Sequence, residues 1–504
     1  MRKVLRFITS KKVILCLSFF INLALFFLLT IYVNSYIYSV ISFVVTMVVL
    51  CFIMSGDDEP IYRTMWTIVI IVLPFFGTAL YLYLRNCRAS KFKRKKFQEI
   101  REESKPYLKQ KEETIDSLNS NNKSQANISR YITNTTNMPV CANTKVKYLK
   151  NGEEYFKHLL EDLAKAKKFI LMQYFIIAEG KLWDEISKIL TEKAKAGVDI
   201  KILYDDFGCM DKISPKVFKK LRTLGIDAVA FNKCKPTINK YTQFRDHRKL
   251  CVIDGLVGYV GGINLADEYA NIEDRFGYWK DTGIRMVGEN VWNLTVLFSN
   301  NWKLERDDFD IEKYRVIKSV ENSSMVQTFG SSPLYREPVA RNNYINMINS
   351  AKDYIYITTP YLLLDSTTVD ALKIAAKSGV DVRIVMPGIP DKKFVWYIGR
   401  SHYKELVGAG VKIYEFSPGF VHAKMVVVDD ITACVGTINF DFRSLYLHFE
   451  NAIMIYNDPS ILDIKKDIFE VINHSSEITM EKVNKRKWYE KMVANILRFF
   501  APLM

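Results

Sequence analysis

HRKLCVIDGLVGYVGGIN, residues 247–264, is matched position for position by HAKMVVVDDITACVGTIN, residues 422–439. Each copy begins with His-x-Lys, runs through apolar residues to an Asp, turns, and ends in small residues and an Asn. Two apolar runs joined by a short turn predict a strand hairpin. Because side chains alternate along a strand, the His and the Lys two residues later should share one face and meet the same ligand.

The repeat extends beyond this hairpin. Residues 153–177 are echoed by residues 342–364, and each copy reads as an amphipathic helix, a lysine-bearing turn and an apolar strand. KAGVDIKILYDD (195–206) is likewise echoed by KSGVDVRIVMPG (377–388), a helix end followed by a glycine turn and a buried strand. This period is far longer than that of a solenoid repeat. The sequence therefore predicts an α/β fold of two similar domains, with sheets that face each other across a cleft and helices on the outer faces.

Composition suggests where these domains begin and end. We expect the two α/β domains at residues 141–320 and 321–480. Residues 98–140 contain the polar stretch SLNSNNKSQANIS and read as a short helix followed by a linker. Residues 481–504 read as a basic amphipathic C-terminal segment, and residues 1–97 as a membrane anchor with a basic flank.

Apolar residues dominate the proposed anchor. One run covers Val13 to Val33, a second continues to Met54, and a third covers Met65 to Leu84. Each approaches the length that crosses a bilayer, and no small-residue cleavage site marks a secretory signal. Basic residues flank both ends, which places both flanks in the cytoplasm and conflicts with three crossings. We therefore expect a multi-pass protein of the cell membrane, with two or three transmembrane helices and cytoplasmic catalytic domains.

Charge and cysteine content narrow the class of protein. The net charge of +16 favours an anionic partner, whether nucleic acid, an acidic membrane surface or a phosphate-bearing substrate. Eight cysteines without paired spacing argue against a disulfide framework or a structural zinc site.

The repeated polar residues suit one kind of ligand, a phosphodiester. One imidazole can attack phosphorus while the other protonates the departing oxygen, and ammonium and amide groups can hold the remaining oxygens. This chemistry requires neither a metal nor another cofactor. The expected catalytic and substrate-binding residues of this kind are His247, Lys249, Asn264, His422, Lys424 and Asn439.

Two pairs of carboxylates accompany these motifs. Glu450 follows the second motif and Asp281 the first, and a carboxylate bonded to the non-attacking ring nitrogen would fix the tautomer of a histidine. We expect Glu450 to orient His422, and we assign Asp281 less firmly because its offset from His247 differs.

Asp254 and Asp429 belong to the repeated pattern as candidate catalytic residues, but they lie where a strand turns, so a structural role is equally open. The other four histidines are expected to be surface residues or to have satisfied partners; they are His158, His402, His448 and His474.

The paired pattern H-x-K-x4-D followed by G-[GST]-x-N resembles the mark of the phospholipase D superfamily, and it is complete in both halves. YDDFGC, GTINFDFRSLYLHFE and the terminal APLM are similar to bacterial cardiolipin synthases over nearly the whole chain. The chain departs from that family in carrying one more apolar run, and His448 where Asn is usual.

The resemblance implies transfer of a phosphatidyl group from one phosphatidylglycerol to another, through an adduct on His247 with His422 as the acid. It implies phosphatidylglycerol and anionic membrane lipid as partners, and no nucleic acid. The alternatives are a hydrolase, either a phospholipase D or a nuclease, and a non-enzymatic lipid-binding scaffold. The oligomeric state, the acceptor alcohol and the acyl-chain preference stay open.

Overall fold

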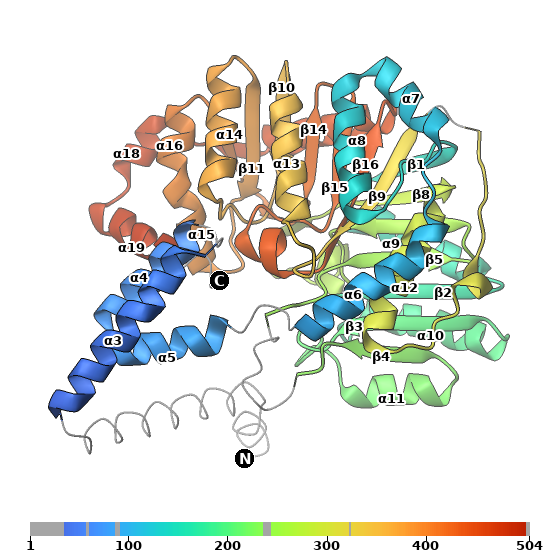
Figure 1. The fold of residues 1–504 in the computed structure, drawn as a ribbon. Coiled ribbons are helices and arrows are strands. Elements are labelled where there is room, and N and C mark those ends of the chain that lie inside the picture. The colour runs from blue at the N-terminus through green and yellow to red at the C-terminus, as the bar shows by residue number, and fades with distance from the viewer. Residues whose placement is uncertain (1–34, 57–59, 86–90, 235–242, 322–323, 500–504) are drawn as a thin grey trace. The chain divides into compact units, whose positions relative to one another are not determined.

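The computed structural model describes residues 35–56, 60–85, 91–234, 243–321 and 324–499. The chain divides into two compact units. The smaller contains residues 1–90 and 232–243, and the larger contains residues 91–231 and nearly all that follow 243. Both copies of the repeated motif lie in the larger unit (Figure 1).

The described part of the smaller unit is helical, with α3 (Ser35–Met54), α4 (Pro60–Val72) and α5 (Pro74–Arg85). The third apolar run, predicted as one span, forms two helices, because Pro74 has no amide hydrogen for a continuous helix and begins a new one. Among the described helices, none combines the length and hydropathy that crossing a bilayer demands. The predicted span from Val13 to Val33 lies outside the described residues.

The first half of the larger unit is built on a seven-stranded sheet of order β1-β8-β6-β5-β2-β3-β4. The strands are β1 (Thr144–Leu149), β2 (Phe169–Tyr174), β3 (Asp199–Asp205), β4 (Asp227–Phe231), β5 (Lys249–Ile253), β6 (Val257–Gly261) and β8 (Gly283–Gly288). The helices of this half are α9 (Gly152–Lys165), α10 (Lys181–Lys195), α11 (Pro215–Thr223) and α12 (Asn290–Glu305).

The second half repeats the arrangement in an eight-stranded sheet of order β17-β12-β11-β10-β14-β15-β16-β9. The strands are β9 (Met325–Ser331), β10 (Tyr354–Thr358), β11 (Asp381–Pro387), β12 (Lys412–Phe416), β14 (Met425–Val428), β15 (Thr432–Gly436), β16 (Glu450–Tyr456) and β17 (Ser475–Glu477). The helices are α13 (Val339–Ser350), α14 (Ser366–Lys377), α15 (Lys393–Gly399), α16 (Tyr403–Gly408), α17 (Ser460–Asn473), α18 (Met480–Lys485) and α19 (Trp488–Phe499).

These sheets confirm the predicted α/β fold of two similar domains. In each, three neighbouring strands are parallel, β2-β3-β4 in one and β10-β11-β12 in the other. The predicted hairpins are also present, as β5-β6 and β14-β15. The other ladders are antiparallel, so the sheets are mixed rather than parallel throughout.

The polar linker predicted at 98–140 is wrong. Residues 91–136 form α6 (Lys91–Ser104), α7 (Glu112–Asn121) and α8 (Lys123–Thr136), and α8 packs beside α13 (Figure 1). Apolar side chains at helical spacing explain this packing, because they are buried in the core of the second half. These side chains are Ile115, Leu118, Ile128 and Ile132.

Backbone pairing joins the two halves beside both repeated motifs. A short parallel ladder pairs β7 (Tyr278–Lys280) of the first half with β13 (Gly419–Val421) of the second. A parallel bridge pairs Asp246 with Phe449. Each pairing lies directly beside one of the repeated His-x-Lys segments, so the contact between the halves positions both segments.

Candidate active site

The backbone pairing places Glu450 beside His247. The amide of His247 donates to the carbonyl of Phe449 over 2.9 Å, and Glu450 is the next residue. Nδ1 of His247 lies 3.0 Å from both carboxylate oxygens of Glu450. Arg248 strengthens the link, since its Nε donates to the carbonyl of Glu450 over 2.9 Å.

The second histidine has the same arrangement in reverse. The amide of His422 donates to the carbonyl of Lys280 over 2.7 Å, and Asp281 is the next residue. Nδ1 of His422 lies 2.6 Å from Oδ2 of Asp281. Each imidazole is therefore held through Nδ1 by a carboxylate, which leaves its Nε2 for a ligand.

The carboxylate assignment made from the sequence is wrong in its pairing. Glu450 orients His247 rather than His422, and Asp281 orients His422 rather than His247. The physical reason is that each His-x-Lys segment pairs with a backbone segment of the other half. The two half-sites thus complete each other, and neither domain alone holds an oriented histidine.

Aromatic rings surround the imidazoles. The ring of Phe175 lies 5.0 Å from that of His247, and the rings of Tyr269 and Trp279 lie 5.3 and 5.4 Å from that of His422. This desolvation disfavours a charged imidazole and lowers the pKa of His247 to about 3 and that of His422 to about 4, against the opposing pull of the carboxylates. Both rings are therefore neutral near pH 7, as a nucleophile must be.

For the two carboxylates, the interaction with the paired histidine outweighs the effect of burial on the pKa. Burial favours the neutral form of Glu450 and Asp281, but the charge and hydrogen bond of the paired histidine outweigh it and hold the pKa of each carboxyl below its ordinary value. Thr437 also donates its hydroxyl to Glu450. Both carboxylates are thus ionised and ready to stabilise an imidazolium during the reaction.

Lys249 is the first residue of β5, and Lys424 immediately precedes β14. Nζ of Lys249 donates to the carbonyl of His247 over 2.6 Å, and Nζ of Lys424 donates to that of His422. Burial lowers the pKa of Lys249 to about 7 and that of Lys424 to about 8, although Glu450 and Asp281 favour the charged forms. The charge of Lys424 also lowers the pKa of Lys249, and the charge of Lys249 lowers the pKa of His422, so charged groups of each half-site act on the other.

The lysine pKa values predict the alkaline limb of the pH profile. Because only the ammonium form stabilises a phosphate, kcat/KM should fall as pH rises through about 7 to 8, where Lys249 and then Lys424 lose their protons in the free enzyme. Rate measurements from pH 6 to 10 test this. The residual activity of Lys249→Arg should lose the limb near pH 7 and keep the limb near pH 8 that Lys424 causes, since guanidinium stays charged. A wild-type profile that is flat to pH 10 would contradict the assignment.

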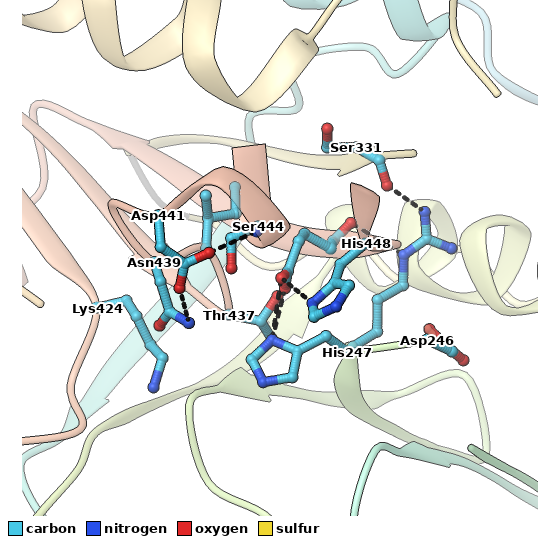
Figure 2. Close-up of polar contacts among 12 residues, drawn as sticks. Asp246, His247, Ser331, Lys424, Thr437, Asn439, Asp441, Ser444 and His448 are labelled. Carbon is cyan, nitrogen blue, oxygen red and sulfur yellow. Dashed lines mark hydrogen bonds and ion pairs between the residues drawn. The ribbon is translucent and has the colours of Figure 1, made fainter. Parts of the chain in front are cut away.

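The two asparagines are held close to the lysines and histidines. Asn264 accepts the amide of Ile176 over 2.9 Å and donates Nδ2 to the hydroxyl of Tyr269 over 2.6 Å. Asn439 donates Nδ2 to Asp441 over 3.0 Å and, among the described residues, its Oδ1 has no hydrogen-bond partner. Figure 2 shows Asn439 next to Lys424.

Asp254 and Asp429 are not placed with the catalytic groups, which corrects their assignment as candidate catalytic residues. Each follows the end of its strand opposite the histidine and has positive φ, 54° and 50°. Oxygens of Asp254 accept the amides of residues 167–169 over 2.7–2.9 Å, and those of Asp429 accept the amides of residues 352–354 over 2.8–3.0 Å. They hold the turn before β2 and β10, which is the structural alternative left open above.

Asp254→Ala should therefore affect stability more than chemistry. Three backbone amides, one in a buried contact and two in partly buried ones, lose their acceptor, and we expect the free energy of unfolding to fall by about 1–3 kcal/mol. Thermal unfolding and kcat measured on the same preparation test this, with kcat expected within about threefold of wild type under conditions where the variant is folded, because no interaction made only in the transition state is removed. An unchanged melting temperature with a rate loss of a thousandfold or more would restore a catalytic role.

His448 was predicted to be a surface or satisfied residue, and that prediction is wrong. It follows a π-helical turn (Arg443–Leu447) and is only 9% exposed. Its ring lies 5.5 Å from that of His247, and its Nδ1 lies 3.7 Å from Glu450, as Figure 2 shows for the two rings. Neither ring nitrogen has a hydrogen-bond partner among the described residues. The signals in the sequence were its place two residues before Glu450 and its departure from the Asn that is usual in the resembled family.

Within the described residues, one group could hold a metal ion. His247, His448 and Glu450 each offer one ligand atom, and these atoms lie within 4.8 Å of one another. The donor set would suit zinc, but it would use groups that already make the pair between His247 and Glu450.

Comparison with known proteins agrees with this site. A family model for the phospholipase D-like domain of cardiolipin synthase matches residues 159–274 and 344–472, and a phospholipase D-nuclease N-terminal model matches residues 40–86. The chain is 34% identical to a cardiolipin synthase of Halalkalibacterium halodurans over 89% of this chain and 90% of that protein. The chain belongs to the cardiolipin synthase family. The resemblance drawn from the sequence is confirmed.

Other proteins match over similar spans. Cardiolipin synthase 2 of Bacillus anthracis is 35% identical over 90% of this chain and 89% of its own length. An uncharacterized protein of Streptococcus mutans is 40% identical over 90% of this chain and 99% of its own. Among solved structures, phosphatidylserine synthase of Haemophilus influenzae superposes with a TM-score of 0.56 at 17% identity, covering 75% of this chain and 97% of that one, which shows a shared fold.

Proposed function

We propose that this chain is a cardiolipin synthase that transfers a phosphatidyl group from one phosphatidylglycerol to another, releasing glycerol. The observation that carries the proposal is the pair of buried imidazoles, each held through Nδ1 by a carboxylate of the opposite half. The similarity to cardiolipin synthases over about nine-tenths of the chain supports the lipid substrate.

In the first step, Nε2 of His247 attacks the phosphorus of phosphatidylglycerol. The bond from phosphorus to the glycerol oxygen breaks, and His422 gives that oxygen a proton as glycerol leaves. Binding of the anionic phosphodiester favours the charged forms of His422 and of both lysines, against the desolvation that lowers their pKa in the free enzyme. Lys249 and Lys424 then stabilise the charge on the non-bridging oxygens.

The second step reverses the roles of the groups. The primary hydroxyl of a second phosphatidylglycerol loses its proton to His422 and attacks phosphorus, and the bond to His247 breaks. Glu450 stabilises the positive charge that His247 carries in the adduct, and Asp281 does the same for His422 when it is protonated. The products are cardiolipin and free His247.

We also propose that the N-terminal segment anchors the enzyme in the cell membrane with the catalytic unit in the cytoplasm. The apolar composition of the first 85 residues and the basic run that follows support this. The match of residues 40–86 to the N-terminal family model supports it as well.

Product analysis with one lipid tests the proposed activity. Purified full-length protein incubated with phosphatidylglycerol alone, with EDTA present, should form cardiolipin and glycerol in equal amounts, which mass spectrometry and a glycerol assay measure. Phosphatidic acid as the main product would show that water is the acceptor and would favour the hydrolase. Retention of full activity in His422→Ala would contradict the role of His422 as the acid.

A further inference from the structure

The last helix presents its apolar face outward. Helix α19 exposes five large apolar side chains, with Trp488 73% exposed and Ile496 53%. At 3.6 residues per turn, all five fall within about 140° of the helix circumference. They are Trp488, Tyr489, Met492, Val493 and Ile496.

The opposite face of α19 packs on the protein. Ala494 is buried, Arg498 forms an ion pair with Glu405 over 3.0 Å, and the helix contacts α15. Surface helices ordinarily bury the apolar stripe and expose the polar one. In α19 the apolar stripe is exposed instead, so this face is suited to contact with an apolar environment such as a membrane or another protein.

The neighbouring segment extends this face. Phe394 at the start of α15 is 46% exposed, and Ile389 in the loop before it is also exposed. Lys392 and Lys393 lie between them and are exposed. We call the five α19 side chains together with Ile389 and Phe394 the apolar face.

We propose that the apolar face inserts into the interfacial layer of an anionic bilayer. Trp and Tyr at one end of the stripe are the side chains that settle at the headgroup level of membranes. Exposed lysines stand next to its residues in the chain, and cations beside a shallow apolar face are typical of helices that lie in the plane of an anionic membrane. These lysines are Lys392 and Lys393, which precede Phe394, and Lys487, which precedes Trp488.

The apolar face is connected to the catalytic segment. The amide of Ile389 donates to the carbonyl of Gly419 over 3.3 Å, and Gly419 begins the strand that leads to His422. In the same loop, Asp391 accepts the hydroxyl of Tyr361 over 2.6 Å and favours the charged form of Lys424. Insertion of this face would therefore bring His422 and Lys424 close to the layer in which phosphatidylglycerol resides. This inference rests on the proposed function for its substrate.

Charged substitutions on the apolar face should lower the turnover of substrate in a bilayer without lowering the turnover of dissolved substrate. In full-length protein, Met492→Asp with Ile496→Asp should lower turnover of phosphatidylglycerol in vesicles on the order of tenfold or more, because carboxylates resist burial in the interfacial layer. Turnover of a short-chain phosphatidylglycerol below its micelle concentration should be unchanged. Ile374→Asp with Leu462→Asp places the same charges on exposed apolar positions of α14 and α17 and should change neither rate.

Insertion itself has a separate readout. Vesicles containing brominated phosphatidylglycerol should quench Trp488, measured as the difference between wild type and Trp488→Phe, and the quenching should be lost in the Met492→Asp, Ile496→Asp protein. Absence of quenching in wild type would overturn the proposal. An equal loss of both turnover rates in the Met492→Asp, Ile496→Asp protein would also overturn it. A cross-link through this face to a second copy of the chain would assign the face to a dimer instead. Quenching without any cardiolipin formation by wild type would reject the proposed function and leave the membrane contact standing.

Discussion

Replacing either His247 or His422 by alanine is expected to lower cardiolipin formation by about four to six powers of ten, the range seen when a nucleophile or its paired acid–base group is removed. Without His247 no adduct can form, and without His422 the glycerol oxygen must leave without a proton. The initial rate of glycerol release from phosphatidylglycerol measures both losses.

A matched control shows that the loss is chemical. His158→Ala removes a partly exposed histidine that lies 2.7 Å from Lys147, in the same domain as His247, and it should leave the rate within about twofold of wild type, as surface substitutions usually do. All three variants should unfold near the wild-type temperature. Substantial activity in either active-site variant would contradict the two-histidine mechanism.

Glu450→Gln and Asp281→Asn are each expected to lower kcat by about three to four powers of ten, as loss of the orienting carboxylate does in a catalytic triad. Each amide cannot stabilise an imidazolium and lets the ring adopt the wrong tautomer. The rate loss alone does not reveal which histidine each carboxylate serves.

Histidine ring nitrogen chemical shifts provide that distinction. In Glu450→Gln the shifts of His247 should change while those of His422 stay, and in Asp281→Asn the reverse should hold. If the Glu450→Gln substitution changed the shifts of His422 instead, Glu450 would orient His422, as expected from the sequence. That result would contradict the pairing of each histidine with a carboxylate of the other half.

The sequence could predict the parts of the fold that each half specifies alone. The repeated hairpin at residues 247–264 and 422–439, the parallel strands and the outer helices all follow from apolar periodicity within one copy. The position of Asp254 at a turn, with its structural role left open, followed from the same local pattern. These features needed no knowledge of how the two copies meet.

The pairing of each histidine with a carboxylate from the other half could not be predicted in this way. Glu450 follows His422 in sequence, and only the backbone bridge between Asp246 and Phe449 reveals that it serves His247. The helices at 112–136 were missed because their polar majority hid a few apolar positions that pack against the second half. His448 was missed because a lone histidine carries no pattern of its own.

Identification of the adduct tests the central claim most directly. Enzyme mixed with phosphatidylglycerol labelled at phosphorus, quenched at alkaline pH within one turnover and digested, should carry the label on the peptide containing His247, and His422→Ala should accumulate the same adduct slowly. A label found on His422 alone would reverse the two roles. A wild-type enzyme that forms cardiolipin with no label on either histidine would contradict the phosphatidyl-histidine mechanism.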